Sequence, residues 1–120
     1  MNGTSMLPKI LIVDDELNIL RSLRRLLEDE ELNITTASSG KEALRVMNDK
    51  RDIAVIVSDM CMPGMTGVEL LEEAKKLLPD AVRIMLTGYS DIKVAIAAIN
   101  RGGAYRYISK PWNDEEFICV

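Results

Sequence analysis

Residues 53–59 read IAVIVSD, an unbroken apolar run rich in β-branched residues that ends in a serine and an aspartate. Residues 10–13, ILIV, form a second such run, and Asp14 and Asp15 follow it directly. Short apolar runs without polar alternation are typical of strands that are covered on both faces. Both runs therefore predict buried strands, and each strand ends in acidic residues.

The segments around these two runs alternate between strand and helix patterns. Further strands are predicted at residues 33–37, 82–86 and 105–108. Between the strands, apolar residues recur at the spacing of amphipathic helices. The predicted helices run from Leu17 to Leu27, from Ser39-Gly40 through Met47, from Val68 to Leu78, from the capping Asp91 to Gly102, and from Asn113 onward. Strands alternating with helices predict an α/β fold, with a parallel sheet and helices on both faces.

Length and charge limit the classes of function. The chain has 120 residues, which suits one domain, and its formal net charge is −4 with no histidine. A mildly acidic domain is poorly suited to bind nucleic acid directly, because contacts to phosphates require clustered Lys and Arg. Without histidine, any chemistry must use carboxylates, hydroxyls and lysine.

Cysteine usage and hydropathy predict the compartment. Cys61 and Cys119 are too few for a disulfide framework and lack a Cys-x-x-Cys spacing, so we expect reduced thiols. Residues 1–8 do not have the pattern of a signal peptide. No apolar run approaches the roughly 20 residues that a membrane-spanning helix requires. We therefore expect a soluble, cytoplasmic protein that does not bind a membrane.

Polar residues whose side chains could bind a ligand or take part in a reaction follow the predicted strands. Asp14 and Asp15 follow the first strand, Asp59 the third, Thr87 the fourth and Lys110 the fifth. The carboxyl ends of parallel strands lie at one edge of the sheet, and in a flavodoxin-like order the first and third strands are neighbours. Taken singly, an aspartate can cap a helix and a lysine can be solvated. Their convergence at one edge favours a site.

Three close carboxylates repel one another unless a proton or a cation is bound. A cluster of oxygen ligands suits Mg²⁺, or alternatively Mn²⁺. A carboxylate can also attack phosphorus and form an aspartyl phosphate, while the metal neutralises charge on both reactants. Lys110 would pair with the phosphate and the Thr87 hydroxyl would donate to it. The pattern predicts metal-assisted acceptance of a phosphoryl group.

The blocks that follow the strands resemble those of receiver domains of bacterial two-component response regulators. The resemblance extends from Lys9 to Phe117 and rests on four ordered blocks: ILIVDDE at 10–16, DMCMPGMTG at 59–67, MLTG at 85–88 and YISKP at 107–111. It implies a CheY-like, doubly wound sheet of five parallel strands in the order 2-1-3-4-5. It also implies a phosphorelay function, in which a sensor histidine kinase phosphorylates a regulatory domain that is not itself a turnover enzyme.

The resemblance assigns roles to the acidic residues. Asp59 would be the phosphoryl acceptor. Asp15 and Asp59 would ligate Mg²⁺ directly, and the backbone carbonyl of Cys61 would be a third protein ligand. Asp14 would act on the metal through water.

The resemblance also implies a conformational switch. Lys110 would hold the phosphate, Thr87 would move toward it, and Tyr107 would change rotamer as the readout. The phosphoryl group would bias a two-state equilibrium of the face formed by the fourth helix, fifth strand and fifth helix. The same face is an expected site of homodimerisation.

Some residues depart from the common family pattern. Gly88 stands where many receivers have alanine, and it should loosen the following loop. We hypothesise that Tyr89 shields the aspartyl phosphate from water. The last helix is short at Val120, which predicts a fragment whose output domain follows residue 120. The block at 105–112 is most similar to receivers joined to HD-GYP cyclic-di-GMP phosphodiesterases, although it also occurs with other outputs.

Three alternative functions fit the sequence less well. A flavin-binding flavodoxin-like domain would need a phosphate loop after the first strand, where the acidic Asp14-Asp15-Glu16 would repel a phosphate. A phosphatase with an aspartate nucleophile would need a second acid at position 61, which is Cys61. An interaction module that works without phosphorylation would tend to lose some of the acceptor, metal-binding, threonine and lysine residues, and this chain keeps them all.

Overall fold

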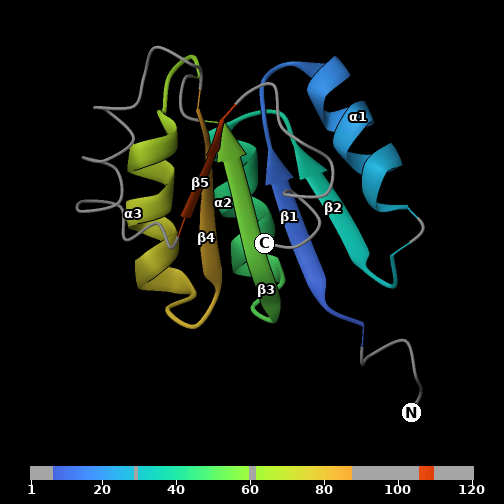
Figure 1. Ribbon diagram of the computed structural model, residues 1–120. Helices are drawn as coiled ribbons and strands as arrows, with labels where there is room; N and C mark the ends of the chain where they lie inside the picture. The colour runs from blue at the N-terminus through green and yellow to red at the C-terminus, as the bar shows by residue number, and fades with distance from the viewer. Residues whose placement is uncertain (1–6, 29, 60–61, 88–105, 110–120) are drawn as a thin grey trace.

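The computed structural model describes residues 7–28, 30–59, 62–87 and 106–109. Within these residues, five parallel strands form one sheet in the order β2-β1-β3-β4-β5 (Figure 1). The strands are β1 (Lys9–Val13), β2 (Asn33–Ala37), β3 (Ile53–Asp59), β4 (Val82–Thr87) and β5 (Arg106–Ser109). The predicted doubly wound α/β fold and its strand order are confirmed.

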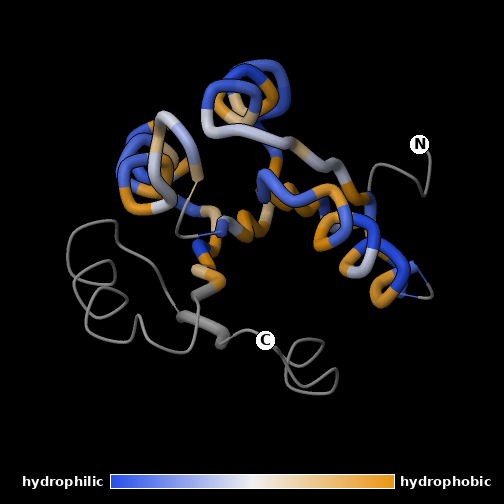
Figure 2. The backbone as a smooth tube through the Cα atoms, turned by 90° about the horizontal axis from the view of Figure 1, so that it is seen from above, coloured by the Kyte–Doolittle hydropathy of each residue, from blue (hydrophilic) through white to orange (hydrophobic). Residues whose placement is uncertain are grey.

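Helices cover both faces of this sheet. Among the described residues they are α1 (Leu17–Leu27), α2 (Gly40–Asp49) and α3 (Gly67–Leu77). Seen from above in Figure 2, α2 and α3 lie on one side of the sheet and α1 lies on the other. The side chains of each strand therefore have a covered surface on either side, which explains the unbroken apolar runs in β1 and β3.

Alternate residues of the strands enter two separate cores. Leu11 and Val13 of β1 belong to the core beneath α2 and α3, whereas Ile12 belongs to the core beneath α1. On β4, Met85 faces the α2 and α3 side and Leu86 faces the α1 side. This period of two is the geometry of a strand, and it ties the pairing register to the burial of every side chain.

Two of the described helices, α2 and α3, begin with side-chain caps. The Ser39 side chain accepts a hydrogen bond from the Glu42 N–H and caps α2. Thr66 and Glu69 form a reciprocal capping box at the start of α3, in which each side chain accepts from the other residue's backbone N–H. These caps fix where the chain turns from the sheet edge into each helix.

The leucines of α1 do not all share its buried face. Leu17, Leu20, Leu23 and Leu27 recur at helical spacing, but 58% of the surface of Leu17 is exposed. Three residues advance an α-helix by about 300°, so each step of three rotates the side chain by roughly 60° around the axis. Two such steps separate Leu17 from Leu23, which is fully buried. Leu17 therefore points away from the sheet.

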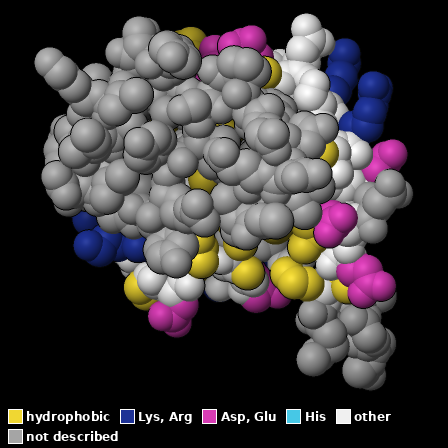
Figure 3. All heavy atoms as spheres, in the orientation of Figure 1, with side chains coloured by type: hydrophobic (Ala, Val, Ile, Leu, Met, Phe, Trp, Pro, Cys, Tyr) yellow, Lys and Arg dark blue, Asp and Glu magenta, His cyan; other side chains and the backbone are white. Residues whose placement is uncertain are grey.

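Two predicted helices, from Asp91 and from Asn113, lie outside the described residues, as does Tyr105. On the face seen in Figure 3, the visible basic side chains occupy two separated areas, one beside α1 and one near the lower end of α3. Acidic side chains lie between and around these areas. Among the helices that the structure describes, none is both long and apolar enough to span a membrane.

Candidate functional site

The strand register brings the acidic residues of β1 and β3 together. In the β1–β3 pairing, Val13 lies opposite Ser58. Asp14 follows Val13 and Asp59 follows Ser58, so the two aspartates occupy matching positions at the carboxyl ends of neighbouring strands. This is the edge of a parallel α/β sheet at which ligands bind.

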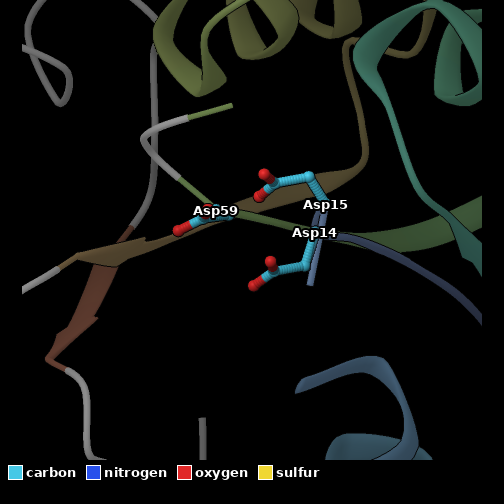
Figure 4. Close-up of side chains that lie close together, drawn as sticks. All are labelled: Asp14, Asp15 and Asp59. Carbon is cyan, nitrogen blue, oxygen red and sulfur yellow. The ribbon is translucent and has the colours of Figure 1, made fainter. Parts of the chain in front are cut away.

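Asp14, Asp15 and Asp59 form a compact acidic cluster. One carboxylate oxygen from each residue lies within 4.8 Å of those from the other two. Figure 4 shows Asp14 and Asp15 extending from the end of β1 toward Asp59 at the end of β3. Asp14 is fully buried and Asp59 is 7% exposed, while Asp15 is exposed. The cluster therefore has a buried floor and one side open to solvent.

Carboxylates this close together repel one another, and burial removes part of their hydration. A bound divalent cation removes both penalties, and carboxylate oxygens are the ligands that Mg²⁺ prefers. The three residues therefore fit a magnesium or manganese ion by donor type, spacing and access from solvent.

A backbone hydrogen bond orients Asp14. Its Oδ1 accepts from the N–H of Glu16 over 2.9 Å. Glu16 is the N-cap residue of α1, and its own side chain makes no capping hydrogen bond. Asp14 therefore shapes the turn between β1 and α1. This bond holds the carboxylate in place at the floor of the cluster.

Ser58 contributes a second local constraint. Its side chain is fully buried, and its Oγ donates to the backbone carbonyl of Asp59 over 3.0 Å. The bond lies on the backbone of the proposed acceptor residue at the point where β3 ends. Sequence reasoning did not single out Ser58, because a serine before an aspartate carries no distinctive pattern.

The chain that leaves Asp59 returns to the core before α3 begins. Met62 is 7% exposed and packs into the core beneath α2 and α3. Gly64 has φ of +79°, a left-handed conformation that favours glycine. The Thr66–Glu69 capping box then starts α3. The signal for this cap, a threonine with a glutamate three residues later, was present in the sequence.

The other predicted site residues are described in part or not at all. Thr87 is the last residue of β4, one position beyond Leu86, which pairs with Asp59. Tyr107 lies in β5, opposite Met85. The backbone of β4 therefore places residue 87 at the same sheet edge as the acidic cluster. Cys61, Lys110 and Tyr89 lie outside the described residues, so their predicted roles stay predictions.

A parallel sheet in this strand order, with an acidic cluster at its carboxyl edge, defines an α/β domain with a candidate cation site where such sheets bind ligands. The family described as the response regulator receiver domain matches residues 10–119. The chain belongs to this family, which acts in two-component phosphorelay signalling.

Individual relatives agree with this assignment. The hydrogenase transcriptional regulatory protein HoxA of Cupriavidus necator is 44% identical over 91% of this chain and 22% of its own length. A response regulator receiver domain protein from Clostridium thermocellum has a TM-score of 0.86 at 39% identity, covering 92% of this chain and 88% of that one. The signal receiver domain of an HD domain-containing protein from Pseudomonas fluorescens Pf-5 has a TM-score of 0.87 at 36% identity, covering 94% and 90%.

The chain spans about a fifth of the length of the curated relatives that it matches, as with the 22% of HoxA. The similarity therefore concerns the receiver domain of these longer proteins.

Proposed function

We propose that Asp59 accepts a phosphoryl group from a sensor histidine kinase in a reaction that requires Mg²⁺. The observation that carries the proposal is the cluster of Asp14, Asp15 and Asp59, whose ligand oxygens lie within 4.8 Å of one another in a receiver domain. In this role the domain is a regulated acceptor and not a turnover enzyme.

The covalent step is an attack by an Asp59 carboxylate oxygen on the phosphorus of a phosphohistidine. An O–P bond forms, the P–N bond to the imidazole breaks, and the electron pair stays on the imidazole nitrogen, which takes up a proton. A bound Mg²⁺ would supply charge neutralisation for the carboxylate and the phosphoryl oxygens. Mn²⁺ has the same preference for oxygen ligands and could replace it.

The residues of the cluster have different proposed roles in binding the cation. Asp15 and Asp59 are the proposed direct carboxylate ligands, together with the backbone carbonyl of Cys61. Asp14 is the proposed ligand through water. The hydrogen bond from the Glu16 N–H to Asp14 Oδ1 supports this division, because it occupies one lone pair of the more buried carboxylate.

The phosphoryl group then needs a partner and a readout. We assign Lys110 to the phosphate oxygens as a mobile point charge. Thr87 would donate its hydroxyl to another oxygen, and Tyr107 would report the change. The position of residue 87 at the carboxyl end of β4 supports the assignment of the threonine.

The output of the switch is proposed to be a domain C-terminal to residue 120. The sequence of the block at 105–112 favours an HD-GYP cyclic-di-GMP phosphodiesterase, and the similarity to the receiver of an HD domain-containing protein supports it. A transcriptional output is the alternative, and the 44% identity to the transcriptional regulator HoxA favours that one. We also propose that the domain forms a homodimer through the face that includes β5. The proposed location is the cytoplasm.

The decisive experiment is intact-mass measurement after incubation with acetyl phosphate and Mg²⁺. Wild-type protein should gain one phosphoryl adduct, and Asp59→Asn should gain none. Asp80→Asn is the matched control, because Asp80 is an exposed aspartate that precedes β4 at the opposite edge of the sheet. It should be phosphorylated like wild type, and EDTA should abolish the adduct in both.

Two results would contradict the proposal. An adduct that persists in Asp59→Asn would move the acceptor to another residue. No adduct with acetyl phosphate, phosphoramidate or a phosphorylated kinase would reduce the domain to an interaction module that works without phosphorylation.

A further inference from the structure

Gly40 has no room for a side chain beside Met65, and the two residues belong to elements that flank the site. Gly40 is the buried first residue of α2, and Met65 lies in the loop between β3 and α3. A Cβ atom placed on Gly40 would lie 2.9 Å from both Cβ and Sδ of Met65 and 3.0 Å from its Cγ. Separations this short are essentially never seen for real Cβ atoms. Position 40 therefore requires glycine, because any larger residue would overlap with Met65.

The identity of the closest atoms determines what a larger residue would displace. Rotation about the side-chain bonds of Met65 moves its Cγ and Sδ, but it leaves Cβ where the backbone puts it. A methyl group at position 40 can be accommodated only if the backbone at residue 65, or that of α2, moves. The start of α2 is held by the Ser39 cap and by the Glu42 carboxylate, which accepts from the Ser38 N–H over 2.7 Å. The loop is then the part that yields.

This loop is the segment that leaves Asp59. Met62 is anchored in the core, and Met65 packs against the same core from its edge. The Thr66 cap follows immediately and fixes the far end of the loop at α3. Among the described residues of the loop, Met62, Met65 and the Thr66 cap hold the chain between Asp59 and α3, and Met65 lies beside the first residue of α2.

We propose that Gly40 is a positioning residue for the acceptor site: close packing of Met65 on Gly40 sets the path of the loop after Asp59 and, through it, the geometry that Asp59 offers to a metal ion. The consequence for metal binding and phosphorylation rests on the function proposed above. The consequence for the loop backbone does not.

The test compares Gly40→Ala with Ser39→Ala. Ser39→Ala removes the cap of the same helix and leaves the space beside Met65 unchanged, so it controls for a simple loss of helix stability. The measurement is backbone amide NMR of residues 59 and 62–66, followed by a Mg²⁺ titration that uses the same signals. Gly40→Ala should shift these amides and raise the half-saturating Mg²⁺ at least threefold. Ser39→Ala should leave both close to wild type.

Second substitutions at position 65 distinguish a displaced loop backbone from a simple change of the Met65 rotamer. Gly40→Ala combined with Met65→Ala keeps the Cβ–Cβ clash and should not restore the Mg²⁺ midpoint. Gly40→Ala combined with Met65→Gly removes the clash and should return the midpoint to that of Met65→Gly alone. Phosphorylation by an acyl phosphate at several Mg²⁺ concentrations should rank the variants in the same order. The half-saturating Mg²⁺ concentration should change more than the maximal rate.

Several results would overturn the inference. These are amide shifts that are equal in Gly40→Ala and Ser39→Ala, or a rescue by Met65→Ala as complete as that by Met65→Gly. If Gly40→Ala does not fold, the double variant Gly40→Ala with Met65→Gly decides: folding with the Mg²⁺ midpoint of Met65→Gly alone supports the inference, and a failure to fold or a weaker midpoint refutes it. A wild-type protein that gains no phosphoryl adduct refutes the proposed function instead, and the amide comparison still tests Gly40.

Discussion

Asp14 and Glu16 are joined by a hydrogen bond of 2.9 Å from the Glu16 N–H to Asp14 Oδ1, so one carboxylate serves both the acidic cluster and the turn into α1. The bond needs an oxygen acceptor but no negative charge. The metal site that we propose needs the charge. Two substitutions of the same residue can therefore separate the two roles.

Asp14→Asn should keep the hydrogen bond and remove one repulsive charge, so its stability in EDTA should equal or exceed that of wild type. Asp14→Ala loses the acceptor and should cost about 1 kcal/mol or more, because the Glu16 N–H loses its partner. Both should weaken Mg²⁺ binding. Urea denaturation in EDTA, followed by a Mg²⁺ titration, measures the two effects, and an Asn variant as unstable as the Ala variant would contradict the assignment.

Mg²⁺ should stabilise the folded domain. A ligand that binds only the native state adds about 2.7 kcal/mol when its concentration is 100 times Kd. Addition of Mg²⁺ should therefore raise the Tm by several degrees in wild type and in Asp80→Asn. The increase should be far smaller in Asp15→Asn and Asp59→Asn. An equal rise in all four proteins would place the bound ion elsewhere.

The pair formed by Lys9 and Asp52, with Nζ 2.6 Å from Oδ2, lies at the amino ends of β1 and β3, opposite the acidic cluster. The hydrogen bond from Lys9 lowers the pKa of the Asp52 carboxyl below its ordinary value. A lowered pKa adds stability above the unfolded-state pKa, about 3.9, and that stability is lost as the pH falls through the native pKa.

Lys9→Met should therefore lose stability relative to wild type at neutral pH, and the difference should shrink as the pH falls below about 4. High salt should shrink it as well, because the pair is exposed to solvent. Chemical denaturation at several pH values measures the difference. A difference that grows toward acidic pH would show that the pair does not stabilise the fold.

Leu23 and Leu17 offer a direct comparison on one helix. Leu23 is fully buried beneath α1 and Leu17 is 58% exposed. Leu23→Ala should cost about 2–5 kcal/mol through lost burial and the cavity it leaves. Leu17→Ala should change the free energy of unfolding by less than about 0.5 kcal/mol. Similar losses for the two variants would contradict the orientation of α1.

Local sequence patterns predicted the strands and the three acidic residues that follow them, whereas the resemblance to receiver domains supplied the strand order. Apolar runs mark buried strands, and the residue after a strand lies at the sheet edge whatever the details of packing. Spacing alone does not separate Leu17 from the buried leucines of α1, since a leucine at a spacing of three can leave the buried face of a helix after two steps.

Features that depend on contacts between distant segments could not be predicted in this way. Nothing in the sequence of α2 says that Met65 will rest on Gly40, and a glycine at a helix start reads as ordinary turn chemistry. The hydrogen bond from Ser58 to the Asp59 carbonyl and the one from Glu16 to Asp14 likewise depend on how the backbone turns at the ends of β3 and β1.

The strand order has a consequence for how the protein comes into being. β1 pairs with β3 as well as with β2, so the carboxylates of the site come from segments separated by two whole helices and a strand. During synthesis, Asp14 and Asp15 leave the ribosome long before Asp59 does, and until β3 pairs with β1 they are two ordinary solvated acids. Under the proposed function, a nascent chain has neither the metal centre nor the acceptor site before that pairing. The proposed competence to receive a signal would then arise in the same event that completes the middle of the sheet.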